Sequence, residues 1–210
     1  MEKFSQNERG LGSIRILPNK TPVYHQGDKA ERIYFVNSGV VMTFRVLADS
    51  ERQITGFCTE GEFFGLSANE NYRDGAITVT SAGIQSLHIS DLENDPILRR
   101  RVVEYAFKKV ENTQNLLLTL TRKSSEERVA SFLLMLAKRR NYKTEDAYDF
   151  EVSLSMSRWD IADYLSLSRE TVSRRLTDLQ TDGLIYMPDV HTAHIGKPNE
   201  LRRRAATTEV

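Results

Sequence analysis

Cysteine is almost absent from this chain of 210 residues, which contains a single one, Cys58. One cysteine cannot form a disulfide framework, and it cannot supply a four-cysteine zinc or iron–sulfur site within one chain. Cys58 stands between Phe57 and Thr59 in an alternating apolar segment. That pattern favours a small, half-buried strand residue over a redox sensor.

Long apolar runs are also missing. No stretch approaches the length of a membrane span, and the polar N-terminal residues 1–12 lack the pattern of a cleavable signal. We therefore expect a cytoplasmic protein with no membrane partner. Hydrophobic residues make up 40% and charged residues 28% of the chain, which is ordinary for a globular protein long enough for two small domains.

A net charge is absent as well, because 29 Lys and Arg balance 29 Asp and Glu. The balance is uneven along the chain. Residues 1–96 contain 9 basic and 13 acidic residues (net −4), whereas residues 97–210 contain 20 and 16 (net +4). The C-terminal half therefore carries the surplus of positive charge that nucleic-acid phosphates attract.

Histidine is scarce, with His25, His88, His191 and His194 as the four examples. A metalloenzyme of the cupin type is one alternative for a chain rich in short strands, and it would need clustered His and Glu ligands. Only His25 and His88 lie between about Ile14 and Ile89, where we expect a sandwich or roll of short strands. We therefore expect no metal site.

Short strands separated by glycine turns are predicted between about Ile14 and Ile89. The segments are rich in β-branched and aromatic residues, and several of them alternate in polarity. They are Ile33–Val36, Val40–Val46, Gln53–Phe57, Ala76–Thr80 and Ile84–Ile89. So many short antiparallel strands favour a sandwich or a roll.

From about Asp95 the periodicity becomes helical. Small or apolar residues recur at alternating steps of three and four, namely Val103, Ala106, Val110, Thr113, Leu117 and Leu120. Three heptads of this kind suit a parallel dimer helix, but a helix that packs on its own β-domain would need a similar stripe. The spacing alone leaves both uses open.

Smaller elements are predicted after this helix. A second helix from Glu126 to about Arg140 would turn four residues inward, Val129, Phe132, Leu133 and Leu136. A polar loop or hairpin (Asn141–Phe150) follows, and then a strand (Phe150–Met156). Further along the chain, Gly183 would cap the C-terminus of a helix, and two strands (Leu184–Tyr186 and Ala193–Ile195) would form a wing. We expect the tail, which includes Arg202–Arg204, to be disordered and able to touch a DNA backbone.

The most informative segment is Arg158–Leu176, RWDIADYLSLSRETVSRRL, which fits two short helices that meet at a tight turn. Ser157 and Asp160 would cap the first helix, and Ser166–Leu167–Ser168 would form the turn. The inward positions are Ile161, Ala162 and Leu165 on the first helix and Val172, Leu176 and Leu179 on the second. A helix-turn-helix places its second helix in the DNA major groove.

The outer face of that second helix carries residues suited to reading bases. Arg presents a planar fork to guanine, Glu accepts from cytosine N4, and Ser can serve phosphate or base. The candidates are Arg169, Glu170, Ser173, Arg174 and Thr177, together with Arg158 at the start of the first helix. An ordinary solvated helix pair would also carry charges, so the spacing favours DNA binding without excluding that simpler interpretation.

Arg175 departs from the pattern, because it occupies a position where this motif usually has a second inward apolar residue. Its stem could lie along the core with the guanidinium at the edge. Alternatively, the helix is rotated slightly.

Four segments together resemble the CRP/FNR superfamily of bacterial transcription regulators. They are VYHQGDKAERIYFVNSGVV (Val23–Val41), GEFFGL (Gly61–Leu66), ERVASFLLMLA (Glu127–Ala137) and SRETVSRRL (Ser168–Leu176). The resemblance runs from about Ile14 to Ile195. It implies an α+β architecture with an antiparallel β-roll (residues 1–95), a dimerisation helix (96–122) and a winged helix-turn-helix domain (123–210).

Two departures from the family indicate which branch this chain belongs to. Members that bind cyclic AMP carry a Glu where this chain has Leu66 and an Arg-Ser pair where it has Asp74-Gly75. An aspartate would repel the cyclic phosphate, so we expect no cyclic AMP binding. The chain also lacks the N-terminal cysteines with which oxygen-sensing FNR proteins hold a cluster. It is therefore most similar to the FixK group.

The resemblance implies a homodimeric activator that binds a palindromic site on double-stranded DNA and acts with RNA polymerase. It also implies a protein that is not an enzyme, with no catalytic residues and no cofactor. Its genes would serve microaerobic respiration, denitrification or nitrogen fixation. The family's base-contacting positions correspond to Glu170, Ser173 and Arg174, and Arg169 matches a cyclic AMP receptor position, so the half-site could contain TTGA or TGTGA. A regulator that senses a small molecule, a haem-bound gas or redox state through the β-roll remains an alternative.

Overall fold

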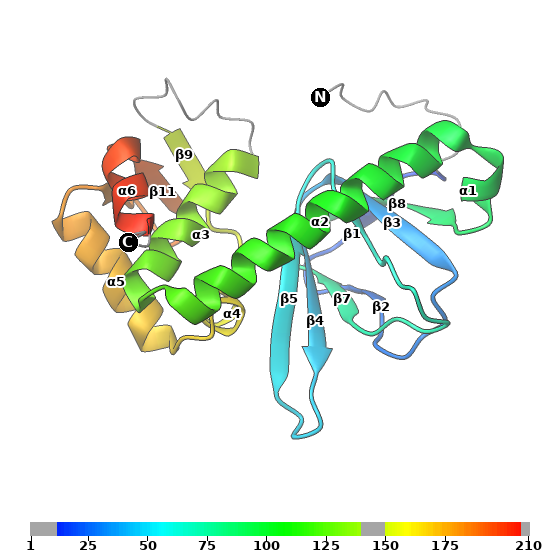
Figure 1. Cartoon of the computed structure of the whole chain (residues 1–210), viewed down its shortest axis with the longest axis horizontal. Helices are drawn as coiled ribbons and strands as arrows, with labels where there is room; N and C mark the ends of the chain where they lie inside the picture. Colours follow the sequence, from blue (N-terminus) through cyan, green and yellow to red (C-terminus); the bar gives the residue numbers. More distant parts are fainter. Residues whose placement is uncertain (1–11, 140–149, 207–210) are drawn as a thin grey trace. The chain divides into compact units, whose positions relative to one another are not determined.

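The computed structural model describes residues 12–139 and 150–206 (Figure 1). The chain divides into two compact units, Met1–Asn112 and Thr113–Val210. The first unit contains the β-strands of the predicted roll, and the second contains the helix-turn-helix segment. The predicted loop or hairpin over residues 141–149 lies outside the described residues.

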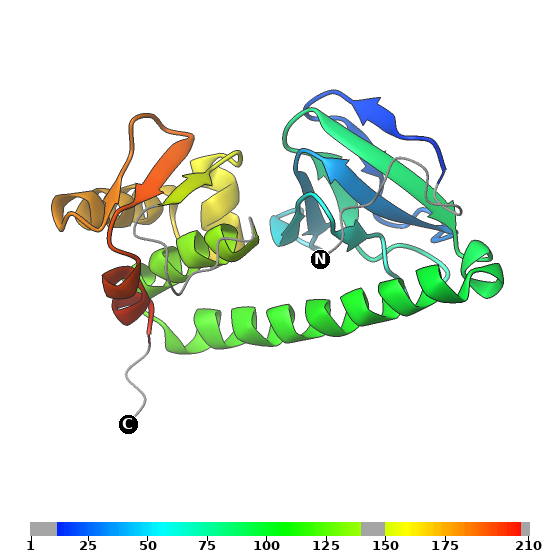
Figure 2. The same ribbon diagram turned by 90° about the horizontal axis from the view of Figure 1, so that it is seen from above.

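The N-terminal unit contains two four-stranded antiparallel sheets, β1-β8-β3-β6 and β2-β7-β4-β5 (Figure 2). Their strands are β1 (Arg15–Leu17), β2 (Pro22–Tyr24), β3 (Arg32–Ser38), β4 (Val41–Val46), β5 (Arg52–Cys58), β6 (Phe63–Phe64), β7 (Gly75–Thr78) and β8 (Ala82–His88). The predicted antiparallel β-roll is confirmed, and five of the strands lie where alternation places them. The sequence prediction missed β1, β2 and β6, which are only two or three residues long.

Aromatic rings fill the space between the two sheets. Tyr24 stacks on Tyr72 with ring centroids 3.9 Å apart, and Tyr34 lies 5.2 Å from both Tyr24 and Phe64. Gly65 has a positive φ of 74°, and a Cβ there would meet the Tyr34 ring at 2.9 Å. Burial raises the pKa of the Tyr24 and Tyr72 phenols. The interior of the roll is therefore occupied by the chain's own uncharged side chains.

The long helix α2 (Pro96–Arg122) follows a single turn, α1 (Asp91–Asn94). Leu98 and Val102 are buried in a cluster with residues of the roll, including Phe35 and Phe63. The other side of α2 is different, because Val103, Phe107, Val110, Leu117 and Leu118 are exposed. One face of α2 thus packs on the β-roll, and a separate apolar stripe remains on the surface.

The C-terminal unit consists of helices and one small sheet. The helices are α3 (Ser125–Arg139), α4 (Arg158–Leu165), α5 (Arg169–Thr181) and α6 (Pro198–Ala205), and the strands are β9 (Phe150–Ser153), β10 (Ile185–Tyr186) and β11 (Thr192–Ile195). The second helix is confirmed, and its predicted inward residues are buried. The predicted pairing of the two wing strands is confirmed, because β10 pairs with β11. The prediction of only two strands was wrong, because β9 also pairs with β11 and completes a three-stranded sheet, β10-β11-β9.

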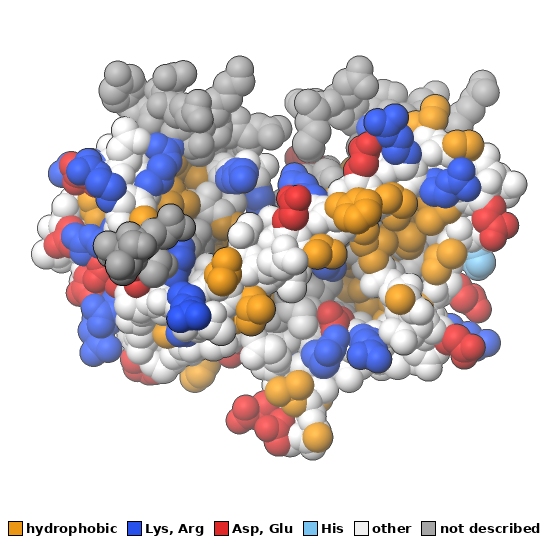
Figure 3. Space-filling view, viewed as in Figure 1, with side chains coloured by type: hydrophobic (Ala, Val, Ile, Leu, Met, Phe, Trp, Pro, Cys, Tyr) orange, Lys and Arg blue, Asp and Glu red, His pale blue; other side chains and the backbone are white. Residues whose placement is uncertain are grey.

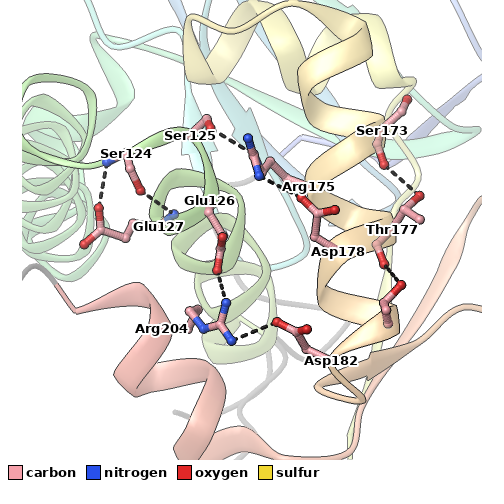
Figure 4. Close-up of polar contacts among 11 residues, drawn as sticks. Ser124, Ser125, Glu126, Glu127, Ser173, Arg175, Thr177, Asp178, Asp182 and Arg204 are labelled. Atoms are coloured by element: carbon pink, nitrogen blue, oxygen red, sulfur yellow. Dashed lines mark hydrogen bonds and ion pairs between the residues drawn. The ribbon is translucent and has the colours of Figure 1, made fainter.

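The predicted disordered tail was also wrong, since Arg202–Arg204 belong to helix α6. Leu201 and Ala205 are buried, and α6 packs against α3. Arg204 forms ion pairs with Glu126 of α3 and, at 2.8 Å, with Asp182 just beyond α5 (Figure 4). Arg204, one of the arginines that suggested a free basic tail, therefore helps to attach α6 to its own domain.

Candidate nucleic-acid interface

The turn between α4 and α5 is fixed by side-chain caps. At the start of α4, Ser157 accepts a hydrogen bond from the Asp160 amide at 3.1 Å, and Asp160 accepts one from the Ser157 amide at 3.0 Å. This is the predicted capping box. Ser166 ends α4 in the left-handed conformation (φ 52°), and Ser168 caps α5 by accepting from the Thr171 amide at 3.1 Å. The predicted turn Ser166–Leu167–Ser168 is confirmed.

The inner faces of α4 and α5 form the core of this domain, as the spacing predicts. All six inward positions are buried, namely Ile161, Ala162, Leu165, Val172, Leu176 and Leu179. Burial of one complete face fixes the rotation of α5 about its axis. The opposite face is therefore held at a defined orientation.

Helix α5 ends in a C-terminal cap that contains a glycine. The Gly183 amide donates to the Gln180 carbonyl at 2.9 Å, and the Leu184 amide donates to the Leu179 carbonyl at 3.0 Å. This is a Schellman motif, in which Gly183 (φ 67°) supplies the left-handed residue just after the C-cap Asp182. Leu179 and Leu184, which the second of these hydrogen bonds joins, are both buried. The helix thus leads directly into the wing.

The predicted base-reading residues of α5 all lie on its exposed face, namely Arg169, Glu170, Ser173, Arg174 and Thr177. The Thr177 hydroxyl donates to the Ser173 carbonyl at 3.1 Å, one turn back along the helix (Figure 4). A hydrogen bond from its own backbone amide, assisted by Arg169, lowers the pKa of the Glu170 carboxyl. At neutral pH this face therefore presents an acceptor carboxylate between donor guanidinium groups.

Arg158 does not lie on the α5 face. Its side chain is half-buried at the first position of α4, and burial lowers the pKa of its guanidinium. The other predicted residues are on one helix, whereas Arg158 belongs to its neighbour. Its DNA contact stays a prediction.

Trp159, which the sequence prediction did not single out, lies beside the base-reading candidates. The Arg169 guanidinium carbon is 5.2 Å from the centroid of the Trp159 ring. Arg169 Nε also lies 3.3 Å from Glu170 Oε1. The sequence contained a signal for this residue, because the chain's one tryptophan stands two residues after the N-cap Ser157, at the start of the predicted helix-turn-helix.

Arg175 follows the first of its two predicted alternatives. Its Nε donates to Ser125 Oγ at 3.0 Å, and its Nη1 donates to Asp178 Oδ2 at 2.7 Å (Figure 4). The stem lies along the domain core and the guanidinium reaches the start of α3. Arg175 therefore stabilises the position of α5 against α3.

Arg128 of α3 binds main-chain carbonyls from the ends of two helices. Its guanidinium donates to the carbonyls of Leu120 at 2.8 Å and Lys123 at 3.0 Å, at the C-terminus of α2. It also donates to those of Leu165 at 3.1 Å and Ser166 at 3.3 Å, at the end of α4. One side chain thereby satisfies four acceptors around the helix-turn-helix.

Arg128→Leu is expected to lower the free energy of unfolding of this domain by about 2–4 kcal/mol, because it leaves part-buried carbonyls without a donor. Urea unfolding followed by tryptophan emission measures this, since Trp159 is the chain's single tryptophan. Arg203→Leu, at an exposed position on α6, is the matched control. An unchanged unfolding midpoint for Arg128→Leu would show that water replaces the guanidinium without cost.

In the β-roll, Asp74 is paired within the protein. Arg45 donates to Asp74 Oδ1 from Nε at 2.9 Å and from Nη2 at 2.7 Å. The Thr55 hydroxyl donates to Asp74 Oδ2 at 2.8 Å. An anion that approached this point would meet a carboxylate whose neighbouring cation is already engaged.

Two kinds of feature are absent from the described parts of the chain. No group of three or more His, Cys, Asp or Glu side chains there could hold a metal ion. Within the same residues, no helix combines the length and the apolar character that crossing a bilayer requires.

Comparison with known proteins agrees with this architecture. Residues 14–91 match the model of the cyclic nucleotide-binding domain, and residues 127–204 match that of the Crp-like helix-turn-helix domain. The chain is 37% identical over 197 residues to the nitrogen fixation regulation protein FixK of Azorhizobium caulinodans, an alignment that covers 92% of this chain and 79% of the relative. It is 34% identical over 169 residues to the transcriptional activator protein anr of Pseudomonas aeruginosa, with coverage of 78% and 68%.

The solved structure of FixK2 from Bradyrhizobium japonicum has the same fold. It aligns with a TM-score of 0.83 and 29% sequence identity, and the alignment covers 94% of this chain and 98% of that chain. A β-roll, a long helix and a winged helix-turn-helix together define a DNA-binding transcription regulator. The chain belongs to the CRP/FNR superfamily, in its FixK-like group.

Proposed function

We propose that this protein is a homodimeric transcription activator that binds a palindromic DNA site through α5. The observation that carries this proposal is the exposed face of α5, on which Glu170, Ser173 and Arg174 follow a capped turn and a fully buried inner face. Arg can bind guanine O6 and N7, and the Glu carboxylate can accept from cytosine N4. Thr177, Arg169 and Arg158 would add base or phosphate contacts around them.

The apolar stripe on α2 supports the dimer. Val103, Val110 and Leu117 of the predicted seam are exposed, and Phe107 and Leu118 extend the stripe beyond it. Hydrophobic side chains gather along the surface that α2 occupies (Figure 3). Rows of exposed apolar residues at heptad spacing are typical of helices that pair with a copy of themselves. We infer that α2 (residues 96–122) joins two copies, between a roll domain (1–95) and a DNA-binding domain (123–210).

The genes and the direction of control are inferred from the relatives. Proteins similar to this chain are named as regulators of nitrogen fixation and as transcriptional activators. We propose that this protein likewise activates genes of microaerobic respiration, denitrification or nitrogen fixation, with RNA polymerase as its partner. The half-site would contain TTGA or TGTGA.

The β-roll would act without cyclic AMP. By the resemblance, Asp74-Gly75 stands where members that bind cyclic AMP carry their Arg-Ser pair, and Asp74 already engages Arg45. Stacked tyrosines occupy the interior of the roll. A ligand shifts an equilibrium only through different affinities for the two states. We therefore expect cyclic AMP to change promoter affinity by less than about twofold. A tenfold gain in a binding titration at saturating cyclic AMP would contradict this.

A fluorescence anisotropy titration with a palindromic duplex and a scrambled one tests the proposed function. The palindrome should bind at least about 1,000-fold more tightly, and both affinities should fall steeply as salt rises, because phosphate contacts release counterions. Equal affinity for the two duplexes at every salt concentration would contradict sequence recognition. No measurable binding to either duplex would remove DNA as the ligand.

A further inference from the structure

Trp159 is a large aromatic residue that the fold does not bury. It is the second residue of α4, and 60% of its surface is exposed. It is not among the buried positions of α4, which are Ile161, Ala162, Tyr164 and Leu165. The ring therefore contributes little to stability through burial, and its neighbours on the surface indicate its role.

The first residue of α5, Arg169, is such a neighbour. The Arg169 guanidinium carbon lies over the Trp159 ring, 5.2 Å from its centroid, a distance at which the ring attracts a cation. Glu170 contacts the same side chain, with Oε1 3.3 Å from Arg169 Nε. A long side chain at the edge of the base-reading face is thus held at two points before any DNA is present.

We propose that Trp159 is a positioning residue for Arg169 and thereby sets the base preference at the half-site position that Arg169 faces. The inference rests on the proposed reading of DNA by α5. An unrestrained arginine loses side-chain entropy when it binds a base, and a side chain that is already held loses less. When Glu170 turns to its own base, the Trp159 ring remains as the contact that holds the guanidinium.

The expected effect is modest but confined to one place. An exposed cation–π contact stabilises its pair enough to change an equilibrium by about two- to fivefold. Trp159→Ala should therefore reduce the preference for the selected base by that factor at the half-site position that Arg169→Ala also affects. The preferences at the other positions should not change. Trp159→Phe keeps an aromatic face and should recover most of the preference.

Selection from duplexes randomised across the half-site measures the base preference of each variant. The set is wild type, Trp159→Ala, Trp159→Phe, Arg169→Ala and the double variant Trp159→Ala/Arg169→Ala. If Trp159 acts through Arg169, the double variant should match Arg169→Ala alone. A uniform loss on all sequences that persists in the Arg169→Ala background would overturn the proposal, because the ring would then contact the DNA backbone itself.

Tryptophan fluorescence tests the contact without DNA, because Trp159 is the chain's single tryptophan. Arg169→Ala should uncover one face of the ring and increase quenching by acrylamide, whereas Arg203→Ala should not. Unchanged quenching in Arg169→Ala would show that the pair does not form in solution, and the proposal would fail. If quenching changes but Arg169→Ala leaves the selected half-site unaltered, the contact exists but Arg169 does not read a base. That result overturns the proposed effect on base preference while leaving DNA binding through the other residues of α5 intact.

Discussion

Val110→Glu and Leu117→Glu are each expected to split the dimer and to weaken binding to a palindromic duplex by about 100-fold or more. Both residues lie on the exposed apolar stripe of α2. In a paired helix each substitution would bury two uncompensated carboxylates, one from each copy, and a buried unpaired charge costs about 3–5 kcal/mol. Sedimentation of the free protein and anisotropy titration of the duplex measure the two effects.

Asn112→Glu is the matched control, because it adds the same charge to an exposed position of α2. At 3.6 residues per turn it lies about 160° round the helix from Val110. It should leave both assembly and DNA binding unchanged. A wild-type protein that sediments as a monomer and still binds a single half-site tightly would contradict the role given to α2.

Arg174→Ala and Glu170→Ala should each reduce affinity for the selected palindrome by about 1–3 kcal/mol, or roughly 5- to 150-fold, because each would remove one of the proposed base contacts. Both side chains are exposed, so the free energy of unfolding should not change. The measurement is a titration of each variant on the palindrome and on random duplex at one salt concentration. Arg203→Ala controls for the loss of one positive charge.

The ratio between the two duplexes decides the interpretation. Base contacts predict a loss confined to the palindrome, whereas phosphate contacts predict similar losses on both. Equal losses for Arg174→Ala and Glu170→Ala would assign these residues to the DNA backbone.

The helix-turn-helix could be predicted from sequence because its signals are local. The capping pair Ser157 and Asp160, the serine turn and the inward residues of α5 all lie within about 25 residues of one another. The same reasoning located α2 and the longer strands. In each case the periodicity of the segment matches the face that the structure buries.

Elements that depend on distant partners could not be predicted in this way. β1 and β6 are too short to show alternation, and they exist because they pair with β8 and β3. The C-terminal arginines suggested a solvated tail, and only the fold brings Arg204 to Glu126, 78 residues away. Likewise, the sequence identified Asp74 as repelling a phosphate but did not show that Arg45 would pair with it.

The stripe on α2 illustrates a different limit. Heptad spacing predicted an apolar seam but left open whether the seam would face the β-roll or a second copy. The structure separates two faces, because Leu98 and Val102 pack on the roll while Val103 and Val110 remain exposed. That separation rests on tertiary contacts, which a helical repeat does not contain.

The most direct test of the central claim is selection of bound sequences from fully randomised duplexes by the wild-type protein. A dimer that reads bases through α5 predicts an enriched motif with two-fold symmetry, whose half-site centres lie about 10–10.5 bp apart and whose half-sites contain TTGA or TGTGA. An enriched motif without symmetry, or no enrichment over the starting library, would contradict the account.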